Sequence, residues 1–300
     1  MINVQNVTKR FADFVAVDNL SCEMPEGCVC GLVGSNGAGK STLLRLMSGV
    51  FKADSGTIEI DGTPVYENPS AKEQLVFVPD ELYFLPQANM NRMAQLYKHT
   101  FPNFSEQRFA TLTSEFGLDP KKNLNTFSKG MRRQAATILA LACLPKYLFL
   151  DETFDGLDPV MRNLVKQTIY KDVCDRGATA IISSHSLREL EDTCDQLALI
   201  HKGALIFESE INDLATSLIK IQVAFNEGIN DRIFGALNVV NISKRGRVAT
   251  LVIRGDAAAS TAALEKLNPI FLETLPLSLE EVFIYEMESV GYNFGEVVES

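Results

Sequence analysis

The sequence predicts an α/β fold with a doubly wound, mainly parallel sheet, an N-terminal antiparallel β part, a helical insert and a small C-terminal α+β domain. Apolar runs at residues 27–33 and 147–150 are typical of strands buried on both faces, as in parallel sheets. Strand-like and helix-like segments then alternate, which favours a doubly wound sheet. The composition changes near the end, so we expect one domain over residues 1–214 and a second over 215–300.

The N-terminal half combines a β part with one helix and a helical insert. Residues 57–65 alternate around Asp61-Gly62, which is a strong hairpin signal. Residues 41–47 have a helical composition. From about residue 89, apolar side chains recur at three- and four-residue steps, which predicts a helical subdomain over about 84–143.

The remaining elements follow from periodicity and length. Helices are expected at residues 129–143, 159–175, 186–195, 231–237 and 260–267. Strands are expected at residues 178–184, 197–201, 220–225, 239–243 and 248–253. Near the end of the chain, Leu279, Val282 and Phe283 would form an apolar face that docks the tail of the C-terminal domain.

Charge and hydropathy argue against several classes of function. A net charge of −10 and a pI of about 4.9 argue against a broad nucleic-acid footprint and against docking onto anionic lipid by charge alone. No run of about 18 apolar residues is present, so we expect no membrane-spanning helix. The start at Met1 lacks a basic region before an apolar run, so no secretory signal is expected. The six cysteines, including Cys28 and Cys30 on one strand face, are expected to be buried free thiols of a reducing cytosol.

A glycine-rich turn between the first buried strand and the following helix matches the pattern G-x-x-x-x-G-K-[ST]. Glycines let successive N–H groups point into one concavity that holds phosphate oxygens, and the helix N-terminus adds the positive end of its dipole. We expect Lys40 to reach the β- and γ-phosphates of ATP and the Ser41 hydroxyl to hold Mg²⁺. A glycine-rich turn without a ligand is the alternative, but the position between strand and helix favours nucleotide binding. The predicted nucleotide-binding residues of this loop are Gly34, Ser35, Asn36, Gly37, Ala38, Gly39, Lys40, Ser41 and Thr42.

Two acidic residues, Asp151 and Glu152, follow directly after the buried strand at 147–150. An acid at the C-terminal end of a central strand faces the ligand crevice of an open α/β sheet. We expect Asp151 to hold Mg²⁺ and Glu152 to polarise the water that attacks the γ-phosphate. A solvated strand end is the alternative, and the phosphate loop in the same sheet outweighs it. The two motifs together predict a P-loop NTPase with ATP and Mg²⁺ as cofactors.

Further motifs follow in a fixed order along the chain. Phe127-Ser128-Lys129-Gly130-Met131-Arg132 resembles the ABC signature Leu-Ser-Gly-Gly-Gln, residues 154–159 resemble the D-loop, and Ile182-Ser183-Ser184-His185 resembles the switch strand with its histidine. On these motifs, residues 2 to about 214 are similar to the ATP-binding subunit of an ABC transporter. Within this family, the chain looks like a bacterial branch that mostly serves export of drugs, bacteriocins or peptides. The features that carry this resemblance are the loop with Asp80 at residues 76–81, the Ser-Lys-Gly-Met form of the signature at 128–131 and the ending at 278–284.

The resemblance implies that two such domains dimerise head to tail with ATP between them. Ser128 and Gly130 would then contact the γ-phosphate from the facing subunit, and Phe11 stands where the family places an aromatic side chain on adenine. His185 would contact the γ-phosphate and the attacking water, and Asp158 would couple the two sites. The implied partners are a second ATPase subunit, in a homodimer or a heterodimer, and a separate integral membrane permease. The chain would lie in the cytoplasm, peripheral on the inner face of the cell membrane, and would bind no nucleic acid.

Two motifs depart from the family pattern. Asp80 stands where the family usually has a glutamine that contacts Mg²⁺ and senses the permease. A carboxylate still binds a hard cation, so we expect Asp80 to meet Mg²⁺ through water or only in the closed dimer. In the signature, Lys129 and Met131 replace a glycine and a glutamine. The cations Lys129, Arg132 and Arg133 are expected on a solvated helix face.

Two other functions are compatible with an ABC-type ATPase domain. A soluble ABC ATPase of translation or DNA repair would usually carry two cassettes or long coiled coils, whereas this chain has one cassette and no sustained heptads. A nucleotide-sensing regulator without turnover is disfavoured by Glu152. The C-terminal domain could be regulatory, a dimer contact or a stabilising cap.

Overall fold

The structure of the chain, a computed structural model, describes residues 1–211, 213, 218–226, 234–235 and 237–289. It divides into two compact units, Met1–Glu208 and Ser209–Ser300. The boundary that the sequence predicts lies slightly later, after residue 214.

An antiparallel sheet opens the N-terminal unit, with strand order β2-β1-β4-β5. Its strands are β1 (Ile2–Phe11), β2 (Phe14–Met24), β4 (Ser55–Ile60) and β5 (Thr63–Pro64). The pairing of Ile60 with Thr63 closes the turn at Asp61-Gly62, which confirms the predicted hairpin. The separate N-terminal β part predicted from the sequence is therefore present.

A six-stranded sheet forms the centre of this unit, with strand order β10-β9-β3-β8-β7-β6. Its strands are β3 (Val29–Val33), β6 (Leu75–Val78), β7 (Tyr147–Asp151), β8 (Thr179–Ser184), β9 (Gln196–His201) and β10 (Ala204–Glu210). β3 pairs in parallel with β8 and β9, and β7 pairs in parallel with β6 and β8. Every residue of β3 and β7 is buried, as their continuous apolar runs predicted. Because these strands are parallel, the segments that follow β3, β7 and β8 meet at one edge of the sheet.

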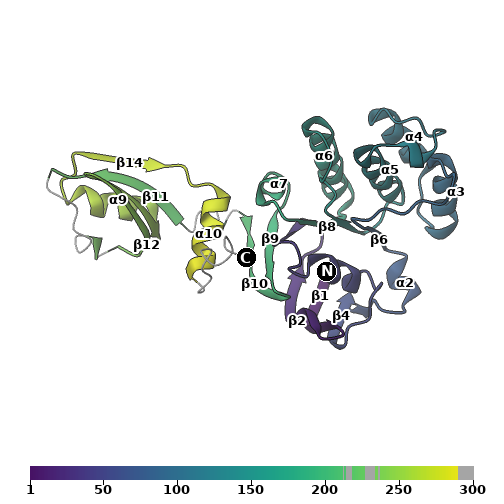
Figure 1. The fold of residues 1–300 in the computed structure, drawn as a ribbon, viewed down its shortest axis with the longest axis horizontal. Helices are drawn as coiled ribbons and strands as arrows, with labels where there is room; N and C mark the ends of the chain where they lie inside the picture. Colours follow the sequence, from purple (N-terminus) through teal and green to yellow (C-terminus); the bar gives the residue numbers. More distant parts are fainter. Residues whose placement is uncertain (212, 214–217, 227–233, 236, 290–300) are drawn as a thin grey trace. The chain divides into compact units, whose positions relative to one another are not determined.

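Most helices of this unit occupy positions that the sequence predicted, but α7 is shorter than expected and α2 was not predicted. They are α1 (Lys40–Met47), α2 (Pro69–Lys72), α3 (Met90–Thr100), α4 (Glu106–Glu115), η1 (Leu124–Thr126), α5 (Lys129–Ala142), α6 (Pro159–Arg176) and α7 (Leu187–Glu191). The helices α3, α4, α5 and α6 lie on the opposite side of the six-stranded sheet from β1, β2 and β4 (Figure 1). α7 is shorter than predicted because the N–H groups of Thr193 and Cys194 both donate to the carbonyl of Leu190, which turns the chain into β9.

The core of the unit anchors α1. Leu43, Leu44 and Met47 are fully buried in one cluster with residues of both sheets, including Ile2 of β1 and Phe149 of β7. α1 carries few polar residues on this face, so burial rather than helix propensity fixes its position. The N-terminus of α1, and the loop that precedes it, are therefore held firmly against the sheet.

The C-terminal unit is a small α+β structure with strand order β12-β13-β11-β14. It contains β11 (Leu218–Ala224), β12 (Val239–Arg245), β13 (Val248–Arg254), α9 (Ala257–Glu265), β14 (Phe271–Leu275) and α10 (Leu279–Ser289). β12 and β13 form the predicted hairpin, and Leu279 and Val282 of α10 are buried as expected, whereas Phe283 is half-buried. The predicted helix at 231–237 falls largely outside the described residues.

Two sequence-based expectations about the whole chain have a direct structural counterpart. The six cysteines are free thiols; Cys22, Cys30, Cys143 and Cys194 are buried as expected, whereas Cys28 is half-buried and Cys174 is exposed. No helix within the described part of the chain is long and apolar enough to cross a bilayer.

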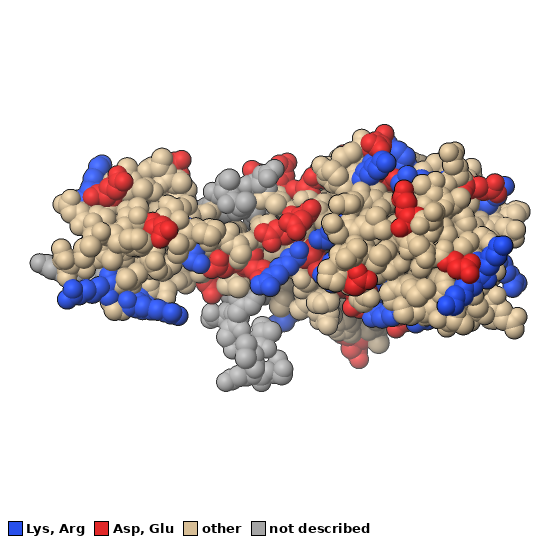
Figure 2. Space-filling model, turned by 90° about the horizontal axis from the view of Figure 1, so that it is seen from above, with Lys and Arg blue, Asp and Glu red and all other residues tan. Residues whose placement is uncertain are grey.

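On the face drawn in Figure 2, basic and acidic side chains are interspersed in both units.

Candidate functional site

The predicted phosphate loop connects β3 to α1 and curls back on itself at a glycine. Gly39 caps α1 with a φ of 109°, and a Cβ at this position would lie 2.5 Å from the carbonyl oxygen of Ala16. No residue with a side chain could take this conformation so close to the neighbouring backbone. The turn leaves the first N–H groups of α1 without intrahelical partners, which makes the loop suited to bind an anion.

Lys40 lies within this loop rather than in solvent. Its Nζ donates to the carbonyl oxygens of Gly34 at 2.7 Å and Ser35 at 3.2 Å, and only 5% of the residue is exposed. The same ammonium lies 3.4 Å from Oε1 of Glu152. The two carbonyls and the carboxylate hold the buried ammonium in place, where it can also bind a second anion in the loop.

Asp151 is the last residue of β7 and is fully buried. Its Oδ1 accepts from Ser41 Oγ at 3.0 Å and from Ser183 Oγ at 2.6 Å. Its Oδ2 is buried and has no hydrogen-bond partner among the described residues. An orphaned carboxylate oxygen beside a serine hydroxyl fits a Mg²⁺ ion, which proteins commonly bind through one or two such groups together with substrate phosphates.

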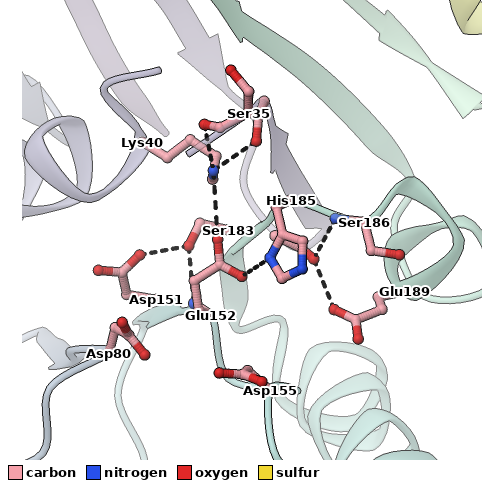
Figure 3. A network of polar contacts seen from close by, with 12 residues as sticks. Ser35, Lys40, Asp80, Asp151, Glu152, Asp155, Ser183, His185, Ser186 and Glu189 are labelled. Atoms are coloured by element: carbon pink, nitrogen blue, oxygen red, sulfur yellow. Dashed lines mark hydrogen bonds and ion pairs between the residues drawn. The ribbon is translucent and has the colours of Figure 1, made fainter. Parts of the chain in front are cut away.

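Glu152 follows in a left-handed backbone conformation, with a φ of 47°. Its N–H donates to Ser183 Oγ at 3.0 Å, which fixes the peptide at the end of the strand. Its carboxylate lies between Lys40 and His185, whose Nδ1 is 2.9 Å from Oε2 (Figure 3). The turn of the backbone thus aims the carboxylate across the mouth of the phosphate loop.

These groups border a cavity of about 360 Å³. It is lined by Phe14, Ala16, Asn36, Gly37, Ala38, Gly39, Lys40, Ser41, Thr42, Asp80, Glu152, Asp155 and His185. Most of the predicted nucleotide-binding loop and the predicted catalytic residues therefore face a single cavity, whose size suits a small ligand. Phe14, which is 61% exposed, lines it, whereas Phe11 packs edge-on against Phe51. The adenine contact of Phe11 stays a prediction.

Ser128, Gly130 and Asp158 do not line this cavity and serve local packing in the single chain. Ser128 caps α5 by accepting from the N–H of Met131 at 3.2 Å. Asp158 caps α6 by accepting from two N–H groups at 3.0 Å. A Cβ at Gly130 would lie 2.6 Å from the carbonyl oxygen of Gly156, so a glycine here lets α5 touch the D-loop segment. Their contacts across a dimer stay predictions.

Asp80 and Arg133 form an ion pair that the sequence did not predict. Arg133 is 1% exposed, so the expectation that it lies on a solvated helix face is wrong. Its Nη2 donates to Asp80 Oδ1 at 2.7 Å, which gives the buried guanidinium its counter-ion. Asp80 also lines the cavity, and its contact with the metal stays a prediction.

Two further residues of the site were not singled out from the sequence. Ser183 sits inside the quoted switch motif, but nothing in the pattern says that its hydroxyl joins Asp151 to the backbone of Glu152. Asp155 lines the cavity, and a hydrogen bond from Lys129 lowers the pKa of its carboxyl. The alternation of side chains along a strand predicts only that Ser183 lies on the same face as Ile181. Its contact with Asp151 depends on the parallel pairing of β8 with β7, which places the two residues side by side.

Comparison with known proteins places the chain among ATP-binding proteins. The ABC transporter family model matches residues 17–155. The chain is 28% identical over 284 residues to the ABC transporter ATP-binding protein YtrB of Bacillus subtilis (strain 168), covering 95% of this chain and 97% of the relative. It is 32% identical to the uncharacterized ABC transporter ATP-binding protein YhcH of the same organism, covering 71% of each chain.

A resistance protein and a solved structure complete the comparison. The chain is 29% identical to the daunorubicin/doxorubicin resistance ATP-binding protein DrrA of Streptomyces peucetius, covering 94% of this chain and 91% of the relative. A dimeric ATP-binding cassette in a post-hydrolysis state, bound to ADP and Pi, matches with a TM-score of 0.63 at 19% identity. That match covers 70% of this chain and 99% of the cassette, and it supports the predicted P-loop fold.

Proposed function

Because this chain belongs to the ABC transporter family of ATP-binding proteins, we propose that it hydrolyses Mg-ATP as the motor subunit of a membrane transporter. The chain is an ATPase of this family, and the coupling to a separate permease is the proposal. The observation that carries it is the convergence of the phosphate loop, Lys40 and Glu152 on one cavity.

Nucleotide binding begins in this proposal at the phosphate loop. The N–H groups at the start of α1 take the β-phosphate, and Lys40 exchanges its carbonyl partners for phosphate oxygens. Phosphate oxygens carry more charge than carbonyl oxygens, so this exchange strengthens the hydrogen bonds of the ammonium. The aromatic ring of Phe14 offers a stacking surface beside the loop.

Mg²⁺ would be held by Ser41 and Asp151, with Asp80 joining through water or in the closed dimer. When bound, the cation neutralises charge on the β- and γ-phosphates. Ser183 keeps the Asp151 carboxylate oriented, because its hydroxyl occupies Oδ1 and leaves Oδ2 available.

Hydrolysis requires a base on the far side of the γ-phosphate. Glu152 accepts the proton of the attacking water at a carboxylate oxygen while the water oxygen bonds to phosphorus and the bond to the leaving ADP oxygen breaks. Arrival of the phosphates draws Lys40 away from Glu152 and frees that oxygen. His185 stays beside the carboxylate and orients it.

The complete site would use two subunits. Ser128 and the N-terminus of α5 would approach the γ-phosphate of the facing chain, since a helix N-terminus binds anions. Asp158 would link the two sites near the D-loop. The order of motifs in the sequence supports this arrangement, whether the second subunit is another copy or a different chain.

Export is the direction we propose, with a separate integral membrane permease and a place on the cytoplasmic face of the membrane. The full-length similarity to a drug resistance ATP-binding protein supports it. The described residues contain no membrane-spanning helix, so passage of cargo would depend on the partner.

Reconstitution with the candidate permease tests the proposal. The chain and the membrane protein encoded beside it would be purified together and placed in inside-out vesicles. We expect Mg-ATP to drive accumulation of a cytotoxic test compound, and the Glu152→Gln variant to abolish it. Failure of the two proteins to associate, or accumulation without ATP hydrolysis, would contradict the proposal.

A further inference from the structure

The guanidinium of Arg133 joins three segments that are far apart in the sequence. It belongs to the first turns of α5, shortly after Ser128. Its Nη2 donates to Asp80 Oδ1 at 2.7 Å, and its Nη1 donates to the carbonyl oxygen of Asp80 at 3.1 Å. The same Nη1 donates to the carbonyl oxygen of Asp151 at 3.3 Å. One side chain therefore ties the loop after β6 and the end of β7 to the signature helix.

Burial makes this arrangement obligatory. Arg133 is 1% exposed, and a buried guanidinium without a carboxylate is strongly disfavoured. Asp80 supplies that carboxylate and still keeps 45% of its side chain exposed. A glutamine in its place could accept one hydrogen bond but could not neutralise the charge.

The pair also adjusts the charge of the cleft. Asp151, Glu152 and Asp155 already bring three carboxylates to the site, and Asp80 lies beside Asp151 (Figure 3). An unpaired fourth carboxylate would repel the phosphates of a nucleotide. Pairing with Arg133 removes most of that repulsion.

We propose that Arg133 is a positioning residue for Glu152, with Asp80 as its counter-ion. This inference rests on the proposed function, because it assigns Glu152 its catalytic role. The shared Nη1 holds the Asp151 carbonyl, which belongs to the peptide that leads into Glu152. Because the Cα of Glu152 belongs to that same peptide, a displacement of the peptide changes where the carboxylate points. Movement of α5 or of the Asp80 loop is thereby transmitted to the catalytic carboxylate.

Four variants of the full chain test the proposal: Arg133→Met, Asp80→Asn, the double variant that carries both, and Arg92→Met as the control. Arg92 is an exposed arginine on α3, outside the motifs and the cavity. Turnover, KM for ATP and the unfolding temperature without nucleotide are measured for each. Loss of alignment of a catalytic group lowers rates without a matching loss of binding.

We expect Arg133→Met to lower kcat about 10- to 100-fold while KM changes less than about threefold. Asp80→Asn should lower both kcat and the unfolding temperature, since it leaves a buried cation alone. The double variant has no uncompensated charge, so its unfolding temperature should recover while its kcat stays low. Arg92→Met should match the wild type.

If kcat recovers together with the unfolding temperature in the double variant, the pair only compensates a buried charge and does not position Glu152, which would overturn the proposal. A kcat near wild type in Arg133→Met would overturn it as well. If Arg133→Met does not fold, the double variant alone decides, because it is free of the buried charge. Failure of the proposed function gives a different result, in which the wild-type chain itself lacks Mg-dependent ATP hydrolysis.

Discussion

The Nζ of Lys40 lies 3.4 Å from Oε1 of Glu152, so the phosphate-loop lysine and the proposed base hold each other before nucleotide binds. Only 5% and 14% of these side chains are exposed, which keeps water from replacing either partner easily. The phosphates of ATP compete with Glu152 for the ammonium, and their higher charge favours them. Binding of substrate and release of the base are therefore linked through one ion pair.

The first prediction concerns Glu152→Gln. The amide cannot accept the proton of the attacking water, so turnover should fall about 100-fold or more. The variant loses a negative charge beside the phosphates, so ATP should bind at least as tightly and hold the dimer together. Turnover is measured by phosphate release and dimerisation by size-exclusion chromatography with Mg-ATP.

Asp155→Asn is the matched control, because it also removes a carboxylate from the cavity wall but not the proposed base. Its turnover should stay much closer to wild type. Comparable losses in the two variants would assign the effect to net charge rather than to proton transfer.

The second prediction concerns Lys40→Ala. Removal of the ammonium takes away a charge-assisted contact with the phosphates, so either ATP affinity or turnover should be lost. Binding of a fluorescent ATP analogue and phosphate release are both measured. Affinity and rate equal to those of the wild type would refute the phosphate-loop assignment.

Much of the fold could be predicted from the sequence because the buried strands and the loop between them have strong local signals. The strand ending at Asp151 and the phosphate loop at Lys40 are both where the pattern predicted. The partner of Arg133 could not be predicted, because helix periodicity says only which face a residue occupies and not which loop covers it. The place of Phe14 in the cavity wall could not be predicted either. Phe11 and Phe14 face each other across the turn at Ala12-Asp13, and only the structure shows which of the two rings lines the cavity.

The third prediction concerns Ser183→Ala, with Ser184→Ala as its control. Both hydroxyls are buried and hydrogen-bonded, so each change should destabilise the chain by about 1–3 kcal/mol. Only Ser183 orients Asp151 and the peptide of Glu152, so only its loss should lower turnover and raise the Mg²⁺ requirement. Equal turnover in the two variants would leave Ser183 a structural role alone.

The fourth prediction separates Phe14 from Phe11. Stacking on a base is worth about 1–3 kcal/mol, so Phe14→Ala should raise KM for ATP about tenfold with little change in kcat. Phe11→Ala should have a smaller effect, because its ring contacts Phe51 rather than the cavity. A larger effect of Phe11→Ala than of Phe14→Ala would assign the adenine contact to Phe11, as the sequence predicts.

The fifth prediction concerns acid stability. Burial raises the pKa of Asp61, but hydrogen bonds from the amino group of Met1, from Tyr147 and from Lys146 outweigh it and lower the pKa to about 2. The folded pKa is below the unfolded value of about 3.9, so the stabilisation is present above about pH 4 and is lost as the pH falls toward 2. Asp61→Asn should therefore be less stable than wild type at pH 6, and the difference should shrink at lower pH. Urea unfolding at several pH values measures this, and a difference that does not vary with pH would contradict it.

The left-handed backbone at residue 152 sets two contributions to stability against each other. A glutamate with a φ of 47° costs about 1 kcal/mol that glycine would avoid and asparagine would reduce. Either replacement would also leave the buried ammonium of Lys40 without its carboxylate, which offsets the gain in the backbone. A programme to make a sturdier version of this protein therefore has little to gain at this position, and it has to screen for phosphate release alongside survival of heating.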